Sequence, residues 1–354
     1  MKLTVLTIFF VTGLVRPVMA FEKHPAPVQW QRIELGSGTG KYDFAVYTNM
    51  PMNSNMNRIK HVIVIQHGLQ RNGFDYLSTA MKLMATNGIA ADKTLIIAPN
   101  FFTILDTGAE ALQGIPIWKV MGWPSGEDSI NTVVKISSFK VFDDLLSLVA
   151  NKTRFPSLTS IVVVGYSDGG AMIQRYAALN RIHKKIQSGG VDLRYVIANS
   201  PSYLYFTHER PRGRSFIPYE SAVCPTYNEY RYGMDKTPPY AGNYTGLEIF
   251  TRFAHRNVTY LLGSEDHDPN HRVLDQSCGA EAQGLNRLSR GLSYIRYERH
   301  LADNLIRLKR QAFEVIDVGH NIEEMFGSKC GIAEIFGASE IKNHAGAVCR
   351  EISL

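Results

Sequence analysis

The sequence predicts an α/β fold in which about eight strands, most of them parallel, form one sheet with helices on both faces. The first observation behind this prediction is that apolar runs of strand length alternate with helix-like segments along the chain. The second is that most of these runs are continuously aliphatic, which is typical of parallel strands buried on both faces. No internal repeat or low-complexity tract interrupts the pattern.

The expected strands begin with two alternating segments suited to antiparallel pairing, and buried segments follow. Their ranges are 32–35, 42–48, 61–65, 94–98, 160–164, 195–198, 258–262 and 313–316. Between them, Leu77, Met81 and Met84 fall on one helical face. A second amphipathic helix is expected after Ser137-Ser138, because serine is a favoured N-cap residue.

The first twenty residues differ in kind from the rest of the chain. Lys2 precedes an apolar run, and Val18 and Ala20 are small residues at the positions that signal peptidase reads. We therefore expect residues 1–20 to be a signal peptide and the protein to be exported, either secreted or periplasmic. No later stretch reaches the roughly 20 apolar residues of a membrane helix, so no integral span is expected after cleavage.

The remainder, residues 21–354, contains no Pro/Gly-rich linker and is expected to form a single domain. Two segments, at about residues 101–133 and 200–250, match no sheet element and are rich in aromatic residues. Insertions beyond strand ends often build substrate pockets, but their tyrosines could equally pack the insertion onto the body. Both interpretations stay open.

The formal net charge of +6 is spread without long basic runs, so no nucleic-acid partner is expected. The most basic short stretch, residues 210–214, is interpreted as a solvated loop. Four cysteines in an exported chain indicate two disulfides, for which three pairings are possible. We prefer Cys224 with Cys278 and Cys330 with Cys349.

The strongest local signal for chemistry is Gly165-Tyr-Ser167-Asp-Gly169, which follows an aliphatic strand and precedes an amphipathic helix. This is the setting of a nucleophile elbow, a strained strand-to-helix turn that raises a serine hydroxyl above the strand ends. The flanking glycines allow close approach of backbone without a Cβ clash. We predict that Ser167 is a nucleophile.

A serine nucleophile needs a base to take its proton and an acid to orient that base. His320 follows the expected strand 313–316 at a turn into helix-like sequence, and it is our candidate base. For the acid, Asp266 and Asp268 both follow the expected strand 258–262. We prefer Asp266, because Asp268 precedes a proline and is suited to capping the next turn. Asp268 stays the alternative acid.

Two backbone N–H groups are expected to stabilise a tetrahedral oxyanion. One belongs to Asp168, directly after the nucleophile, and the other to Leu69 in the loop that begins at His67-Gly68. Arg71, further along that loop, could brace it or contact substrate. The cluster of His and Asp residues around Asp266 could suggest a metal, but one turn rarely supplies full coordination, so neither a metal nor a cofactor is expected.

These motifs follow the order found in the α/β-hydrolase superfamily, which the chain resembles over nearly its whole mature length. They are His67-Gly68, Gly165-x-Ser167-x-Gly169, Gly263-x-x-Asp266 and Gly319-His320. More narrowly, the chain resembles a poorly characterised group of secreted bacterial and fungal serine hydrolases in His67-Gly-x-x-Arg-Asn72, Gln174-Arg-Tyr-Ala177, Cys224-Pro-x-Tyr-Asn228 and Asp268-Pro-Asn-His271. The resemblance implies an esterase-type mechanism and an insertion after the sixth strand that acts as a cap.

The sequence departs from the superfamily pattern at the elbow, where Tyr166 and Asp168 replace the His and Ala that are frequent there. An acidic side chain beside the nucleophile would disfavour anionic substrates unless it points into solvent. The expected activity is hydrolysis of a small-molecule or polymeric ester through a Ser-His-Asp acyl-enzyme mechanism. Two alternatives stay open: an amidase, peptidase or acyltransferase with the same residues, and a non-catalytic module that binds a ligand or partner.

Overall fold

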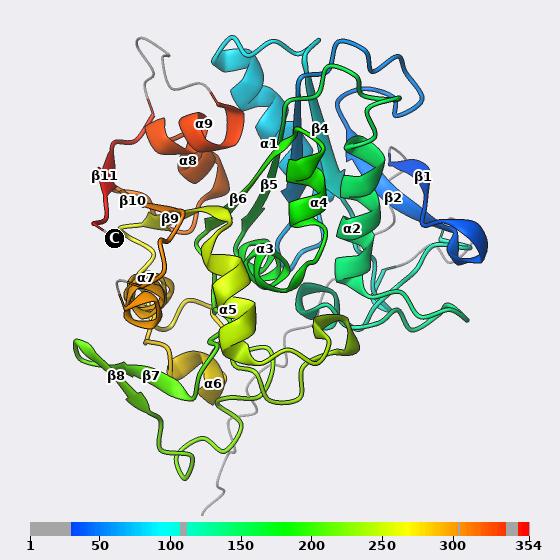
Figure 1. The fold of residues 1–354 in the computed structure, drawn as a ribbon. Coiled ribbons are helices and arrows are strands. Elements are labelled where there is room, and N and C mark those ends of the chain that lie inside the picture. Colours follow the sequence, from blue (N-terminus) through cyan, green and yellow to red (C-terminus); the bar gives the residue numbers. More distant parts are fainter. Residues whose placement is uncertain (1–29, 107–111, 304, 338–345, 354) are drawn as a thin grey trace, which may run out of the picture.

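The computed structural model describes residues 30–106, 112–303, 305–337 and 346–353, so the expected signal peptide at 1–20 lies outside the described residues. A nine-stranded sheet runs through the molecule in the order β1-β2-β4-β3-β5-β6-β9-β10-β11 (Figure 1). Its strands are β1 (Gln31–Leu35), β2 (Tyr42–Thr48), β3 (His61–Gln66), β4 (Thr94–Pro99), β5 (Ser160–Tyr166), β6 (Asp192–Ala198), β9 (Asn257–Gly263), β10 (Arg310–Val315) and β11 (Cys349–Glu351).

The centre of this sheet is parallel and its two edges are antiparallel. The neighbours from β4 to β10 all pair in parallel, whereas β1 pairs with β2, β2 with β4, and β11 with β10 in antiparallel fashion. Each expected strand overlaps an observed one, and the antiparallel opening pair is confirmed. The prediction missed β11, because a three-residue edge strand is too short to show an alternating pattern.

Helices cover both faces of the sheet, as predicted. They are α1 (Gly73–Thr86), α2 (Ser138–Val149), α3 (Asp168–Leu179), α4 (His183–Ser188), α5 (Gly246–Ala254), α6 (Cys278–Glu281), α7 (Arg287–Ala302), α8 (Ile322–Phe326) and α9 (Lys329–Phe336), with short 3-10 turns η1 (Gly38–Gly40), η2 (Trp123–Ser125) and η3 (Pro239–Ala241). Apolar residues of α1, α8 and α9 pack on one face, and those of α2, α3, α4, α5 and α7 pack on the other. The mostly aliphatic strands serve both layers at once, because successive side chains point to opposite faces.

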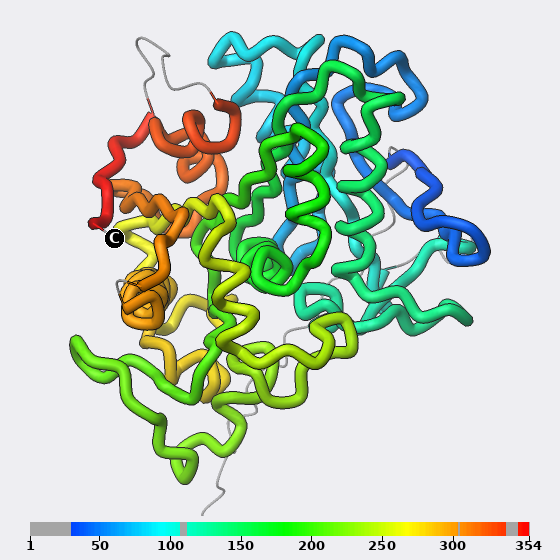
Figure 2. Tube along the Cα trace, viewed as in Figure 1, coloured from blue at the N-terminus to red at the C-terminus, as the bar shows by residue number. Residues whose placement is uncertain are grey.

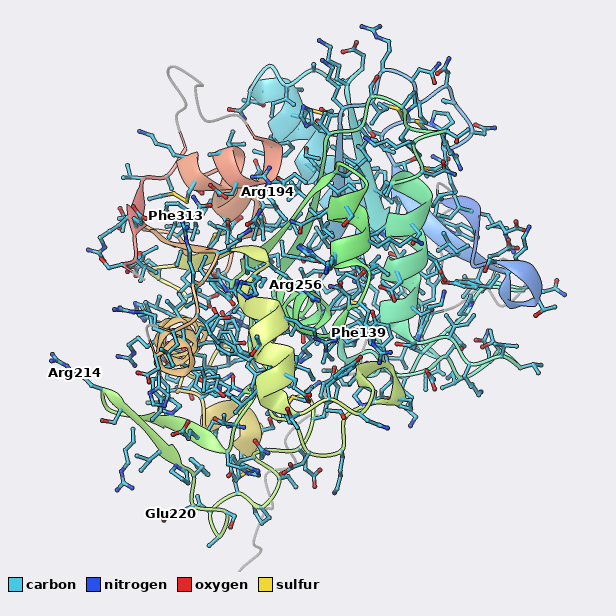
Figure 3. The ribbon with its side chains drawn as sticks, viewed as in Figure 1. Phe139, Arg194, Arg214, Glu220, Arg256 and Phe313 are labelled. Atoms are coloured by element: carbon cyan, nitrogen blue, oxygen red, sulfur yellow. A yellow bond between two sulfur atoms is a disulfide. The ribbon has the colours of Figure 1, made fainter. Side chains whose placement is uncertain are left out.

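The segment between β6 and β9 contains a separate two-stranded hairpin, β7 (Glu209–Arg212) with β8 (Ser215–Pro218). This hairpin extends from the rest of the molecule in Figure 2, and Arg214 at its turn points outward in Figure 3. The interpretation of residues 210–214 as a solvated loop is wrong for Arg210, which is 1% exposed. Its guanidinium lies 4.5 Å from the Tyr205 ring centroid, and this contact compensates part of the cost of burial.

The aromatic residues of the two insertions contribute mainly to packing. Tyr203 stacks on Tyr294 of α7 with ring centroids 4.6 Å apart, and Tyr205 packs on Tyr297 of the same helix at 4.3 Å. Trp118 and Trp123, from the insertion at 101–133, are fully buried in the core. Of that insertion, residues 107–111 lie outside the described chain. The insertion at 200–250 is also less irregular than expected, because α5 begins within it.

The preferred cysteine pairing is confirmed, with disulfides between Cys224 and Cys278 and between Cys330 and Cys349. The first connects the segment after β8 to α6, and the second connects α9 to β11. Each disulfide therefore attaches an irregular or edge segment to a helix. No helix within the described ranges is both long enough and apolar enough to cross a membrane.

Candidate active site

Ser167 lies on a strained turn between β5 and α3. Its backbone has φ 57° and ψ −126°, a conformation that costs a serine roughly 1–3 kcal/mol unless the surroundings enforce it. The two neighbouring glycines show how the surroundings do so. A Cβ added at Gly165 would lie 2.2 Å from the carbonyl oxygen of Gly169, and a Cβ added at Gly169 would lie 2.5 Å from that of Gln66. Only glycine at both positions allows this turn.

A continuous row of hydrogen bonds connects Ser167, His320 and Asp266. The Ser167 Oγ lies 3.1 Å from Nε2 of His320, and Nδ1 of the same ring lies 2.7 Å from Oδ2 of Asp266. Because an ionised carboxylate only accepts hydrogen bonds, the ring proton is on Nδ1, and the Nδ1–H donates a hydrogen bond to Asp266. Nε2 is then free to accept the hydrogen bond from the serine hydroxyl.

His320 and Asp266 reach Ser167 from two loops that Asn199 joins. Asn199 follows β6, and its Oδ1 accepts a hydrogen bond from the Gly263 N–H at 2.8 Å. Its Nδ2 donates to the Gly319 carbonyl at 3.1 Å. One side chain thus fixes the turn after β9 relative to the turn after β10. Asn199 was not predicted, since nothing in the local sequence separates it from an ordinary residue at a strand end.

The two acid candidates have different environments. Asp266 is 4% exposed, whereas Asp268 lies at the surface and accepts a hydrogen bond from the Asn270 N–H at 2.8 Å. Asp268 therefore caps the following turn, as the sequence suggested, and does not contact His320. Burial alone would raise the pKa of Asp266, but the hydrogen bonds and charges of His320 and Arg287 outweigh it and leave this pKa below its usual value.

The loop after β3 is fixed by His67 and Arg71. His67 is fully buried, its Nδ1 lies 2.8 Å from the Gly68 carbonyl, and its Nε2 accepts a hydrogen bond from the Phe101 N–H at 3.1 Å. Burial lowers the pKa of His67 to about 3, so the ring is neutral and donates from Nδ1. Arg71 donates to the Leu69 carbonyl at 3.1 Å and forms a buried ion pair with Asp106 at 3.0 Å. Arg71 thus braces the loop.

The two expected oxyanion donors have free N–H groups. Within the described chain, the backbone N–H groups of Leu69 and Asp168 donate no hydrogen bond to another protein atom. A Cβ added at Gly68 would lie 3.7 Å from the Ser167 Cβ, so this loop lies directly against the nucleophile turn. Because Asp168 is also the first residue of α3, the positive end of the helix dipole lies at the same place.

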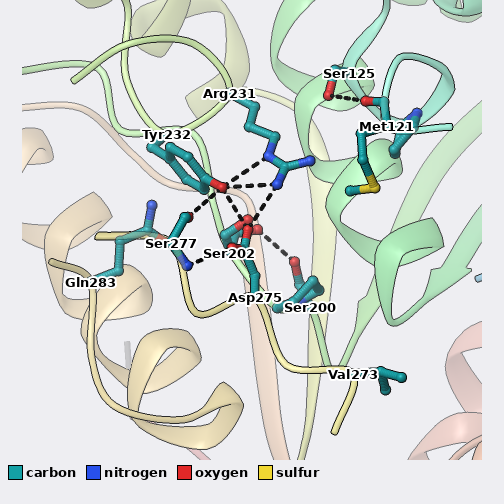
Figure 4. A network of polar contacts seen from close by, with 12 residues as sticks. Met121, Ser125, Ser200, Ser202, Arg231, Tyr232, Val273, Asp275, Ser277 and Gln283 are labelled. Atoms are coloured by element: carbon teal, nitrogen blue, oxygen red, sulfur yellow. Dashed lines mark hydrogen bonds and ion pairs between the residues drawn. The ribbon is translucent and has the colours of Figure 1, made fainter. Parts of the chain in front are cut away.

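Figure 4 shows a polar network that includes Arg231 and Asp275. The charge of Arg231 lowers the pKa of Asp168 and that of Asp275 raises it, so the network acts on a group next to the nucleophile. Arg231 donates from Nε to the Tyr232 hydroxyl at 3.0 Å and from Nη2 to Asp275 at 3.1 Å. Asp275 in turn accepts a hydrogen bond from Tyr232 at 2.7 Å. Arg231 belongs to the insertion after β6, and Asp275 belongs to the connection between β9 and α6. Arg231 and Asp275 were not predicted, because their contact joins segments distant in the sequence.

His271 and Arg287 also adjoin the site without having been predicted. The His271 ring lies 5.1 Å from that of His320, and burial is the main reason that its pKa is lowered. Arg287 donates to Asp266 Oδ1 at 3.1 Å. His271 belongs to the motif Asp268-Pro-Asn-His271, and that motif was the one available signal. No grouping of His, Cys, Asp and Glu suited to a metal ion occurs within the ranges that the structure describes.

Comparison with known proteins agrees with the fold. No family model and no curated protein matches the sequence. Solved structures do match. LpqC, a poly(3-hydroxybutyrate) depolymerase from Bordetella parapertussis, is similar with a TM-score of 0.58 and 19% identity, over 86% of this chain and 87% of its own. Poly(aspartic acid) hydrolase-1 from Sphingomonas sp. KT-1 is similar with a TM-score of 0.56 and 19% identity, over 84% and 95%. The chain has the α/β-hydrolase fold, as expected.

Proposed function

We propose that the protein is an exported serine ester hydrolase, similar to carboxylesterases and lipases, that acts through an acyl-enzyme on Ser167. The observation that carries this proposal is the continuous hydrogen-bonded row from Ser167 through His320 to Asp266, with distances of 3.1 and 2.7 Å. A serine hydroxyl is a weak nucleophile, and this arrangement is the one that activates it.

In the first step, the Ser167 Oγ forms a bond to the acyl carbon of the ester while its proton moves to His320 Nε2. The electron pair of the carbonyl double bond moves onto the carbonyl oxygen. The free N–H groups of Leu69 and Asp168 stabilise the resulting oxyanion. Donors preorganised in this way contribute about 3–4 kcal/mol each to transition-state stabilisation. Asp266 stabilises the imidazolium and keeps its own charge.

In the second step, the oxyanion collapses and the bond to the alcohol oxygen breaks. The leaving alcohol takes the proton from His320 Nε2, which leaves an acyl-enzyme and a neutral histidine. Water then gives a proton to Nε2 and attacks the acyl carbon. Collapse of this second intermediate returns the proton to Ser167 and releases the acid. The cycle needs only water as co-reactant.

The substrate is proposed to be a small-molecule or polymeric ester. The fold neighbours are described as a poly(3-hydroxybutyrate) depolymerase and a poly(aspartic acid) hydrolase, and both names refer to a polymer as the substrate. The same residues could act on amides or transfer the acyl group to an alcohol. A comparison of matched p-nitrophenyl esters and p-nitroanilides, with and without added alcohol, distinguishes these reactions.

The decisive test is the variant Ser167→Ala with a control at an exposed serine, Ser54→Ala. We expect the wild type and the control to hydrolyse p-nitrophenyl esters and to react covalently with a fluorophosphonate. Ser167→Ala should lose the labelling and lower kcat by about 10⁴–10⁶-fold. Persistent labelling or ester turnover in Ser167→Ala would falsify the proposal. A wild type that binds esters without turning them over would favour a binding module.

Export is proposed from the first twenty residues and agrees with the two disulfides, which persist in oxidising compartments. Expression of the full chain in a secreting host tests it. We expect the exported protein to begin at Phe21 when its N-terminus is sequenced. A protein that stays in the cell fraction and still carries residues 1–20 would contradict this part of the proposal.

A further inference from the structure

Among the residues that the structure describes, none forms a hydrogen bond or an ion pair with the side chain of Asp168. It directly follows Ser167 and is 9% exposed. Within the described chain its carboxylate accepts no side-chain or backbone hydrogen bond and forms no ion pair. Its oxygens are also absent from the enclosed, unpartnered polar atoms of the described residues, so they are not completely shut off from the surroundings.

This arrangement is costly for a carboxylate. Burial raises the pKa of Asp168, and the charge of Arg231 opposes that effect most strongly, followed by that of Arg287. Neither arginine binds the carboxylate, because Arg231 is directed to Tyr232 and Asp275, and Arg287 to Asp266. A buried polar group without a partner destabilises the folded protein. A substrate that supplies the missing hydrogen bond would explain why the group lies there.

The charges around Asp168 restrict what that substrate group can be. An acceptor oxygen needs a donor, so the group carries an O–H or N–H. Three positive charges, those of Arg175, Arg231 and Arg287, act on the Asp168 carboxyl against one negative charge, that of Asp275, so the surrounding charges disfavour an ammonium group. A substrate carboxylate would meet Asp168 itself as a like charge. A neutral hydroxyl avoids both penalties.

We propose that the side chain of Asp168 selects esters that carry a free hydroxyl group close to the scissile carbonyl, by accepting a hydrogen bond from that hydroxyl. The inference rests on the proposed function, because the substrate hydroxyl comes close to Asp168 only when Ser167 attacks the carbonyl of the same substrate. The backbone N–H of Asp168 then stabilises the oxyanion, while its side chain binds the substrate hydroxyl and so determines specificity. The notion that this residue points into solvent does not hold, since it is nine-tenths buried.

The test compares p-nitrophenyl esters of butyrate, 2-hydroxybutyrate and 3-hydroxybutyrate on the same enzyme. We expect the wild type to prefer at least one hydroxy ester over butyrate by about 5–10-fold in kcat/KM, the scale of one hydrogen bond. Asp168→Ala should reduce this ratio to about 1, whereas Asp168→Asn, which keeps an acceptor oxygen, should retain part of the preference. The ratio is taken within each variant, so a change in turnover that affects all three esters alike does not alter it. Because the carboxylate has no protein partner, alanine leaves no other group unpaired.

Asp92→Ala is the matched control. Asp92 is exposed and pairs with the exposed Arg58. It precedes the start of β4, whereas the site lies at the carboxyl ends of the strands, so its removal deletes one negative charge outside the site. The control should keep the wild-type ratio. A wild-type ratio near 1, which needs no variant, or an unchanged ratio in Asp168→Ala would overturn the inference and leave the proposed function intact. Absence of turnover with all three esters would overturn both.

Discussion

Arg287 donates a hydrogen bond to one carboxylate oxygen of Asp266, and His320 donates a hydrogen bond to the other. Its Nη1 donates to Oδ1 at 3.1 Å, while His320 donates to Oδ2 at 2.7 Å. The side chains of Arg287 and Asp266 are 1% and 3% exposed, so solvent does not compete for this contact. The orientation of the carboxylate, and with it that of the imidazole, therefore depends on an arginine from α7.

We expect Arg287→Met to misorient Asp266 and so to lower kcat by about 10²-fold with little change in KM. It should also lower the free energy of unfolding by roughly 3–5 kcal/mol, since it leaves a buried carboxylate short of one partner. Steady-state kinetics and urea unfolding measure the two effects. Arg272→Met removes an exposed arginine nearby and serves as the control. An unchanged kcat in Arg287→Met would show that His320 alone orients Asp266.

His67 provides a pH-dependent contribution to stability. Its pKa in the folded protein is about 3, against an ordinary value of 6.5. Between pH 3 and pH 6.5 the ring is therefore protonated in the unfolded chain and neutral in the folded protein. The neutral ring therefore contributes fully above about pH 6.5, and its contribution is lost as the pH falls toward 3. The stability difference between the wild type and His67→Asn should be about 2 kcal/mol smaller at pH 5 than at pH 7.

Urea unfolding of both proteins at the two pH values measures this difference. His67→Asn also loses the acceptor for the Phe101 N–H, which fixes the loop that carries Leu69. We therefore expect kcat to fall more than KM rises in this variant. A pH-independent stability difference would mean that His67 accepts a proton in the folded protein.

Asp143 acts in the opposite direction. Burial raises its pKa to about 6, although hydrogen bonds from Tyr240 at 2.9 Å and Tyr176 at 3.0 Å oppose the increase. The folded chain thus holds a proton that the unfolded chain releases above about pH 4, so stability falls as the pH rises from 4 to 6. The loss is at most roughly 3 kcal/mol. Asp143→Asn should remove this decline in unfolding experiments at pH 4, 5 and 6, and an identical decline in the variant would contradict the assignment.

The two disulfides should differ in their effect on activity. Loops of 54 and 19 residues correspond to about 4 and about 3 kcal/mol of stabilisation for Cys224–Cys278 and Cys330–Cys349. We expect both double serine variants to unfold at lower denaturant concentration. Only removal of Cys224–Cys278 should also raise KM, because that bond connects the segment that carries Arg231 to the segment that follows Asp275. Equal KM values in the two variants would show that this disulfide does not position the contact between Arg231 and Asp275 for the site.

The sequence determined the layout of the fold and the candidates for the site. Aliphatic runs and helical periodicity located the parallel strands and many of the helices, since both depend on the local pattern of burial. The motif around Ser167 and the position of His320 after a strand could be recognised because strand ends in a parallel sheet meet at one edge. Their catalytic roles stay predictions.

The tertiary structure decided which groups are in contact. The proline after Asp268 favoured Asp266 as the acid, but only the fold brings Asp266 into contact with a histidine 54 residues away. Asn199, Arg231 and Arg287 have partners in other segments, so no local pattern marks them. Burial is likewise a property of the assembled chain. It makes His67 neutral and raises the pKa of Asp168, because removal from water, rather than residue type, sets the cost of each charge.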